Sequence, residues 1–194
     1  MVGAVLTQGT SWRNVEKAIY GLKSLSLLSP EAIRRMDDEE LSAIIRPCGF
    51  YRVKTKRLKS LINWLGVYDD SLERLSSEET DVLRRSLLGV KGIGKETADA
   101  ILLYALGRPV FVIDSYTRRI MSRLGMGPDD GSYDELQRLF GDTLPNDPQL
   151  FNEFHALLVR LGKDACRPTP LCLRCCLVTL CSFYQSEGHL QRHS

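Results

Sequence analysis

This sequence of 194 residues has no long apolar run and only a small excess of positive over negative charge. It also lacks the alternation of apolar and polar residues that is typical of strands. No uncharged stretch approaches the roughly 18 to 20 apolar residues that a membrane-spanning helix requires, so we expect no membrane partner. Lys and Arg number 26 against 24 Asp and Glu, which gives a net charge of +2, so a contact with an acidic partner must come from a local patch. A hydrophobic share of 43% with 26% charged residues excludes a disordered or collagen-like chain. The sequence therefore predicts a globular protein with one core or two small ones.

Cysteine is nearly absent outside one segment, because five of the six cysteines lie between residues 166 and 181 and only Cys48 lies elsewhere. A secreted disulfide framework would spread its cysteines along the chain, so we expect a reducing, cytoplasmic compartment. Crowded thiols in such a compartment indicate a metal site.

The sequence shows the signals of helix starts and ends, and it shows no alternation of apolar and polar residues that would indicate strands. Ser29–Glu31 combines a cap, a first-turn proline and a first-turn acid, and Ser132–Glu135 has the spacing of a capping box. Gly125 and Gly162 follow apolar runs of helical period and so predict helix ends. A further run of this period contains Leu58, Leu61, Ile62 and Leu65. We expect an all-α fold with roughly eight to ten short helices and no internal repeat.

The crowded cysteines have the spacing C-x5-C-x2-C-x5-C, formed by Cys166, Cys172, Cys175 and Cys181. Zinc sites are typically built from paired C-x2-C units, whereas here one such pair has two longer arms, which favours a [4Fe-4S] cluster. Zinc and disulfide pairing are the alternatives, and Cys176 is a fifth thiol that could replace a neighbour. We expect a structural role, since a metal centre folds a segment too short to build a core. A redox role is the weaker alternative.

A glycine-rich segment, Gly89–Ala98, fits G-x-x-x-x-G-K except that Glu96 stands where a phosphate-binding loop has Ser or Thr. The preceding Glu78–Leu88 has a helical and not a strand pattern, so we expect two helices joined by a tight turn. Gly92 and Gly94 would then expose backbone N–H groups at the start of a helix, and such a turn can grip one phosphate without reading sequence. A turn that only connects packed helices is the alternative.

Downstream, the apolar run Val110–Ile113 delivers one carboxylate, Asp114, to the start of a helix. Asp is a common N-cap, so a purely structural role is the alternative to a catalytic one. Both roles can coexist.

Basic residues cluster without an acid between residues 46 and 59, and Phe50 and Tyr51 lie among them. We favour phosphate binding over a merely solvated helix face. The six are Arg46, Arg52, Lys54, Lys56, Arg57 and Lys59. His155, on an apolar helical stretch, is interpreted as an interior histidine.

The hairpin Val90–Ala98, the segment Val112–Asp114 and the four spaced cysteines, in this order and separation, resemble the helix-hairpin-helix DNA glycosylases of the endonuclease III family. The resemblance extends from Ala4 to Cys181, and the segment Thr7–Trp12 is most similar to the branch that includes 3-methyladenine glycosylases.

This resemblance implies a six-helix barrel domain over residues 1–107, with the helix-hairpin-helix at about 86–106. It also implies a helical iron–sulfur cluster domain over 108–194, with the cluster loop at 166–181, and a DNA cleft between the two domains. Because the sequence begins in an apolar helical stretch, we expect one packing helix of the family to be missing at its start.

The resemblance also implies roles for single residues. Asp114 matches the aspartate that assists departure of the base, Gln8 lies where the family inserts a side chain beside the flipped nucleotide, and the four cysteines match the cluster ligands. The expected DNA contacts are Gln8, Gly92, Gly94, Lys95, Arg52, Lys54 and Arg57. The aromatic candidates for stacking on the extruded base are Trp12, Tyr51 and Tyr104, although each on its own is more often a core residue.

One departure from the family pattern concerns the chemistry, because bifunctional members carry a lysine where this sequence has Glu96. A lysine amine attacks the sugar and nicks the strand, which a carboxylate cannot do. Lys95 is one position away and should point about 100° aside.

We therefore expect a monomeric, nucleoid-associated base excision enzyme that flips a damaged or mismatched base from double-stranded DNA and hydrolyses its glycosidic bond. The alternatives are a bifunctional glycosylase and abasic-site lyase acting on oxidised pyrimidines, and a non-catalytic DNA-binding or redox-sensing module.

Overall fold

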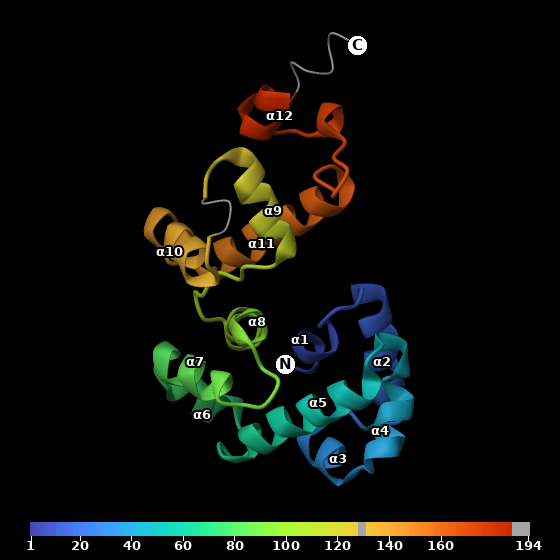
Figure 1. Cartoon of the computed structure of the whole chain (residues 1–194). Coiled ribbons are helices and arrows are strands. Elements are labelled where there is room, and N and C mark those ends of the chain that lie inside the picture. The colour runs from blue at the N-terminus through green and yellow to red at the C-terminus, as the bar shows by residue number, and fades with distance from the viewer. Residues whose placement is uncertain (128–130, 188–194) are drawn as a thin grey trace. The chain divides into compact units, whose positions relative to one another are not determined.

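The computed structural model describes residues 1–127 and 131–187, and every regular element in these ranges is a helix (Figure 1). The expectation of an all-helical protein is confirmed. The described residues form twelve α-helices and three 3-10 helices, more than the roughly eight to ten expected. The excess comes from helices such as α1 (Val2–Leu6) and α3 (Pro30–Arg35), whose five or six residues are too few to show a helical period.

The chain divides by its internal packing into two compact units, Met1–Arg108 and the part from Pro109 onward. That the first is a barrel domain and the second a cluster domain stays a prediction. Within residues 1–127 and 131–187, no helix combines the length and the apolar character needed to cross a membrane.

The first unit is organised around α5 (Tyr51–Gly66), the longest of its helices. This helix lies against α1, α3 and α4 (Asp38–Ile44) (Figure 1). The expected apolar run faces inward on α5, with Leu58 and Leu61 fully buried and Ile62 and Leu65 nearly so. The remaining helices of this unit are α2 (Trp12–Ser24), η1 (Arg46–Cys48), α6 (Leu72–Ser77), α7 (Thr80–Leu88) and α8 (Lys95–Leu106).

A buried ion pair fixes α7 against α8. Arg84 donates through Nε and Nη2 to the two carboxylate oxygens of Asp99 over 2.7 and 2.9 Å, and the Asp99 side chain is fully buried. A bidentate pair of this kind restricts both the rotation of the two helices and the distance between them. The two helices therefore hold the ends of the turn at residues 89–94 in place.

The second unit has an aromatic core. The Phe111 and Phe140 rings stack with their centroids 3.8 Å apart, and Phe151 meets Phe111 edge-on at 5.4 Å. The expected capping box is present, since the N–H of Ser132 donates to Glu135 and the N–H of Glu135 donates to the Ser132 hydroxyl. The helices of this unit are α9 (Ser115–Leu124), α10 (Tyr133–Thr143), α11 (Pro148–Asp164), η2 (Cys172–Arg174), η3 (Val178–Leu180) and α12 (Ser182–Glu187).

The two glycines that predicted helix ends behave differently. Gly125 ends α9 in the left-handed conformation, with φ at 69°, as expected. Gly162 does not end a helix, because α11 continues to Asp164, and this prediction is wrong. A Cβ at Gly162 would lie 2.4 Å from Cδ1 of Tyr116, so the residue is glycine because α9 and α11 approach closely there.

Candidate active site and cysteine pocket

The glycine-rich segment forms a turn between α7 and α8, which confirms two helices joined by a tight turn and excludes the strand-first phosphate loop. Gly92 has φ at 88°, and a Cβ there would lie 2.3 Å from Cγ of Arg57, so glycine is required by both the backbone and its neighbour. Gly94 begins α8 without a side-chain cap, and a Cβ there would meet no atom of the chain within 4 Å. The outer face of the turn is therefore open to a group approaching the backbone.

Gln8 joins the loop after α1 to this turn. Its Nε2 donates to the carbonyl of Gly92 at 3.1 Å and to the hydroxyl of Thr97 at 2.9 Å. Its Oε1 accepts from Nη1 of Arg57 at 2.5 Å. Three residues expected to contact DNA, Gln8, Gly92 and Arg57, thus form one hydrogen-bonded group, and Thr97 is a member that sequence reasoning missed.

The expectation that Lys54 contacts DNA is wrong. Its side chain is only 1% exposed, and Nζ donates to the carbonyls of Leu6 and Cys48 at 2.9 and 2.7 Å. Lys54 precedes Leu58 and Leu61 by four and seven positions, so it shares their inward face of α5. Burial is the main influence on this ammonium and lowers its pKa.

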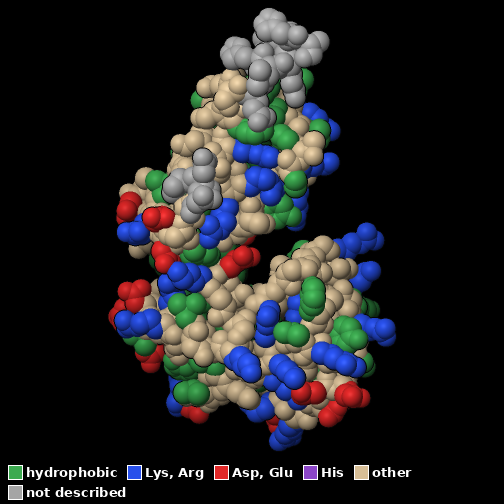
Figure 2. Space-filling view, viewed as in Figure 1, with side chains coloured by type: hydrophobic (Ala, Val, Ile, Leu, Met, Phe, Trp, Pro, Cys, Tyr) green, Lys and Arg blue, Asp and Glu red, His purple; other side chains and the backbone are tan. Residues whose placement is uncertain are grey.

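The other basic residues of the patch reach the surface. Arg52 and Lys56 are exposed, Arg57 is half-buried, and Lys95 is exposed at the start of α8. Figure 2 shows Lys and Arg side chains spread over the visible face of the first unit. An open groove joins α5 to the hairpin turn and is lined by Lys56, Arg57, Lys59 and Lys91 together with Asp38, which pairs with Lys59.

The three aromatic candidates are partly accessible. Trp12 is 50% and Tyr104 48% exposed, and Tyr51 is intermediate. A more exposed ring was missed: Phe50 is 75% exposed in a left-handed backbone conformation, with φ at 46°. Its signal in the sequence was its position after Pro-Cys-Gly, which predicts a turn rather than a core. The role of the three candidates in a base pocket stays a prediction.

In the second unit, Asp114 caps α9, and its carboxylate has two partners within the chain. Oδ1 accepts from the N–H of Thr117 at 2.7 Å, and Oδ2 lies 3.5 Å from Nε2 of His155 on α11. The side chains of Asp114 and His155 are 13% and 11% exposed. The interior histidine expected from the sequence is thus buried, and its partner is the candidate catalytic carboxylate.

The electrostatics of Asp114 balance opposing effects. Burial, the largest, raises the pKa of the carboxyl, but the contact with His155 and the N–H of Thr117 together outweigh it and bring the pKa below its ordinary value of 3.8. The N-terminal end of a helix favours negative charge in the same sense. Asp114 is therefore ionised at neutral pH. Its carboxylate is a weak base, and its two partners fix the orientation of the side chain.

Glu96, which we expect to stand at the position of the lysine of bifunctional glycosylases, lies exposed in the first turn of α8. The structure therefore presents a carboxylate there and not an amine.

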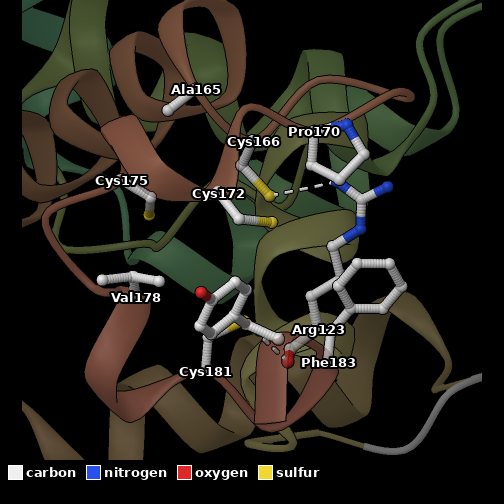
Figure 3. A pocket seen from close by; sticks show the side chains of 10 residues that line it. Arg123, Ala165, Cys166, Pro170, Cys172, Cys175, Val178, Cys181 and Phe183 are labelled. Carbon is white, nitrogen blue, oxygen red and sulfur yellow. Dashed lines mark hydrogen bonds between the residues drawn. The ribbon is translucent and has the colours of Figure 1, made fainter. Parts of the chain in front are cut away.

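The four spaced cysteines line one pocket of the second unit (Figure 3). Cys176 is exposed and is not among the lining residues, so the structure separates the fifth thiol from the other four. None of the six cysteines, all of which lie in the described residues, is joined in a disulfide. In the described part of the chain, no three Cys, His, Asp or Glu side chains are grouped closely enough to hold a single metal ion.

Arg123 connects α9 to this cysteine segment. Its Nη1 donates to Sγ of Cys166 at 3.3 Å, a contact drawn in Figure 3, and to the carbonyl of Arg167 at 2.6 Å. Its Nη2 donates to the carbonyl of Pro168 at 2.8 Å, and the guanidinium lies over the ring of Phe183. The helix that presents Asp114 at its start therefore holds the cysteine segment at its end.

Comparison with known proteins identifies the family to which the chain belongs. Residues 2–146 match the family model described as HhH-GPD superfamily base excision DNA repair protein. A Methanocaldococcus jannaschii protein assigned as a DNA repair glycosylase is 44% identical over 183 residues, which cover 93% of this chain and 83% of that protein.

Two solved structures are similar. The H. pylori 3-methyladenine DNA glycosylase bound to 1,N6-ethenoadenine is 36% identical, with a TM-score of 0.74 over 84% of this chain and 82% of that one. An endonuclease III in a non-covalent DNA complex gives a TM-score of 0.80 over 97% of this chain and 84% of its own, and at 23% identity it shows the shared fold alone. The chain belongs to the HhH-GPD superfamily of base excision DNA repair proteins.

Proposed function

We propose that this DNA glycosylase removes its base by hydrolysis alone, with Asp114 as the catalytic carboxylate. The observation that carries this assignment is the setting of Asp114, which is ionised and is held by the N–H of Thr117 and by His155 at the start of α9. A purely structural cap would need the first of these partners but not the second.

The chemistry needs a fixed negative charge. As the bond between the base and C1′ of the sugar breaks, positive charge develops on the sugar, and a preorganised carboxylate stabilises it. Water then adds to C1′, and its proton leaves with the base or the solvent. Because the pKa of Asp114 is lowered, electrostatic stabilisation and orientation of the water are its main contributions, and proton abstraction is a minor one.

We propose that strand nicking is weak or absent, because it requires an amine to attack C1′ and form a Schiff base. Glu96 supplies none at the position of the family lysine. A bifunctional glycosylase and abasic-site lyase is the second candidate, in which Lys95 or Lys91 would replace that amine.

We further propose that the hairpin turn grips one phosphate of the DNA backbone through Gly92 and Gly94, with Lys95, Arg52 and Arg57 adding positive charge. Gln8 is the side chain expected to enter the duplex. Since its amide is bonded to Arg57, Gly92 and Thr97, entry requires it to exchange these partners for partners in the DNA.

We propose that the base removed from the DNA is an alkylated purine. Support comes from the 36% identity with the H. pylori enzyme, whose structure holds 1,N6-ethenoadenine, and from the likeness of Thr7–Trp12 to the same branch. A mismatched pyrimidine is the second class to test.

We propose that Cys166, Cys172, Cys175 and Cys181 hold a [4Fe-4S] cluster. Their side chains line one common pocket, and the guanidinium of Arg123 beside Cys166 would offset the negative charge of thiolate ligands. When bound, the cluster supplies cross-links that hold a segment without a core of its own. A monomeric state and a cytoplasmic, nucleoid-associated location stay predictions.

Borohydride trapping tests the central assignment. Duplexes containing 3-methyladenine, 1,N6-ethenoadenine, a T:G mismatch, thymine glycol or an abasic site are incubated with the enzyme, with and without borohydride and with and without later alkali. We expect cleavage of an alkylated-purine duplex only after alkali, and no covalent complex.

Two variants complete this experiment. Glu96→Lys should gain a trapped complex, and Asp114→Asn should lose excision. Trapping and direct nicking by the unaltered protein would overturn hydrolysis as the mechanism, and absence of excision from every duplex would favour a non-catalytic module.

A further inference from the structure

Lys54 is a buried ammonium that donates hydrogen bonds to two backbone carbonyls, each at the end of a helix. Leu6 is the last residue of α1 and Cys48 the last of η1. The carbonyls at the end of a helix carry partial negative charge and lack partners within the helix. Lys54 therefore satisfies two helix ends with one side chain and holds them close together.

Each of these carbonyls lies two residues before a side chain that points away from the core. Gln8 follows Leu6 by two positions and is partly exposed, and Phe50 follows Cys48 by two positions and is 75% exposed. Both loops contain left-handed backbone conformations, at Gly9 (φ 63°) directly after Gln8, at Gly49 (φ 64°) directly before Phe50, and at Phe50 itself (φ 46°). The same ammonium thus sets where both loops leave the core.

Stability alone is a poor explanation for a charge at this place. Burial of an ammonium is costly, and replacement of buried charges by apolar residues of similar volume is often neutral for stability. The side chain shares its helix face with Leu58 and Leu61, which are apolar. What an apolar residue cannot supply is a rigid connection between two carbonyls on separate elements.

We propose that Lys54 is a positioning residue that sets the spacing between the loop of Gln8 and the turn of Phe50, so that the two loops engage duplex DNA as one unit. This role rests on the proposed function. It predicts that Lys54 matters for opening a paired base and not for the hydrolysis itself, because Lys54 touches neither DNA nor the reacting atoms.

The test compares one lesion in two settings, paired within a duplex and unpaired within a single strand, by single-turnover excision. We expect Lys54→Met to slow excision from the duplex by about tenfold or more and from the single strand by less than about threefold. Lys54→Gln keeps two N–H donors and should restore part of the duplex rate. Lys17→Met, an exposed lysine on α2 outside the basic patch, is the matched control and should leave the ratio of the two rates unchanged.

A double-mutant cycle separates positioning from general destabilisation. If Lys54 acts through Gln8, then Lys54→Met in a Gln8→Ala background should add less than about threefold to the loss. Equal losses on paired and unpaired lesions, full additivity with Gln8→Ala, or failure of both Lys54 variants to fold would overturn the proposal. Failure of the proposed function is distinct, because the unaltered enzyme would then excise nothing from either substrate.

Discussion

Helices α8 and α9 both begin at a candidate functional residue, but their first turns are built differently. The start of α8 is Gly94, which has no side chain to cap the helix and leaves the outer face of the turn open. The start of α9 is Asp114, whose carboxylate occupies the equivalent place and accepts from the N–H of Thr117. The N-terminal end of a helix attracts negative charge in both cases. At the N-cap of α8, beside Glu96 of the first turn, that charge can come from outside the chain, and at α9 the N-cap residue itself supplies it.

This difference is the reason why we propose binding at one helix start and chemistry at the other. A turn without side chains adapts to any phosphate and reads no sequence. A carboxylate held by two partners keeps its charge and direction, which a transition state requires and a binding surface does not.

Removal of the charge at α9 should have the largest effect. Asp114→Asn keeps an oxygen that can accept from Thr117, and Asn is a good N-cap, so the fold should be retained. We expect excision to fall by about 10²- to 10³-fold, as measured by single-turnover release of the base. An unchanged rate in a folded variant would show that Asp114 is only a cap.

Addition of a methyl group at α8 should have the next largest effect. Gly94→Ala has free space within the protein and an ordinary backbone, so we expect unchanged thermal stability but about tenfold weaker DNA binding, since the methyl group stands where a phosphate would approach. DNA affinity by fluorescence anisotropy and thermal unfolding measure the two quantities.

Gly92→Ala is the contrasting variant, because its Cβ would meet Arg57 and its φ is 88°. It should lower the free energy of unfolding by about 1 to 3 kcal/mol as well as weaken binding. If both variants bind DNA as the unaltered protein does, the open turn at α8 is not the phosphate site.

Loss of the hydrogen bonds that Arg123 makes at the C-terminal end of α9 should lower the stability of the protein. Arg123→Ala removes hydrogen bonds to Cys166, Arg167 and Pro168, so we expect the free energy of unfolding to fall by about 1 to 3 kcal/mol and iron to be lost more readily to a chelator. Calorimetry and iron analysis provide the readouts. Arg118→Ala is the control, since Arg118 donates a hydrogen bond to the carbonyl of Gly131, outside the cysteine segment. An equal loss of iron in both variants would count against a specific role of Arg123.

The smallest expected effect concerns pH. His155→Phe removes one of the partners that lower the pKa of Asp114, so the pKa should rise and the acid limb of the pH–rate profile should move to higher pH. The native carboxyl has a pKa below its ordinary 3.8, so its contribution to stability is present above that value and is lost as pH falls through the native pKa. In the variant the native pKa lies closer to the ordinary value, so that loss should be smaller and complete at a higher pH, as acid titration followed by helical content would show. Identical acid limbs would mean that His155 does not act on the charge of Asp114.

Patterns that depend on neighbours along the chain were predicted well. The hairpin glycines, the cap at Asp114 and the capping box at Ser132 each follow from residues within a few positions of one another. The four cysteines are also close in sequence, and the structure places them around one pocket.

Patterns that depend on packing across the chain were predicted poorly. Lys54 belongs to a basic run in the sequence, yet it lies on the inward face of α5 because its helical phase matches Leu58 and Leu61. Gly162 ends an apolar run, yet it lies inside α11 because Tyr116 needs the space.

The sequence by itself determined the all-helical class, the hairpin turn, the candidate aspartate and the cysteine spacing, because hydrogen bonds and side-chain periods within a helix are set over three or four residues. Only the tertiary structure decided which polar residues meet. Gln8 contacts Arg57 and Thr97 across 49 and 89 positions, and His155 reaches Asp114 from a different helix. Such contacts depend on how helices pack against one another, which no local period of the sequence encodes.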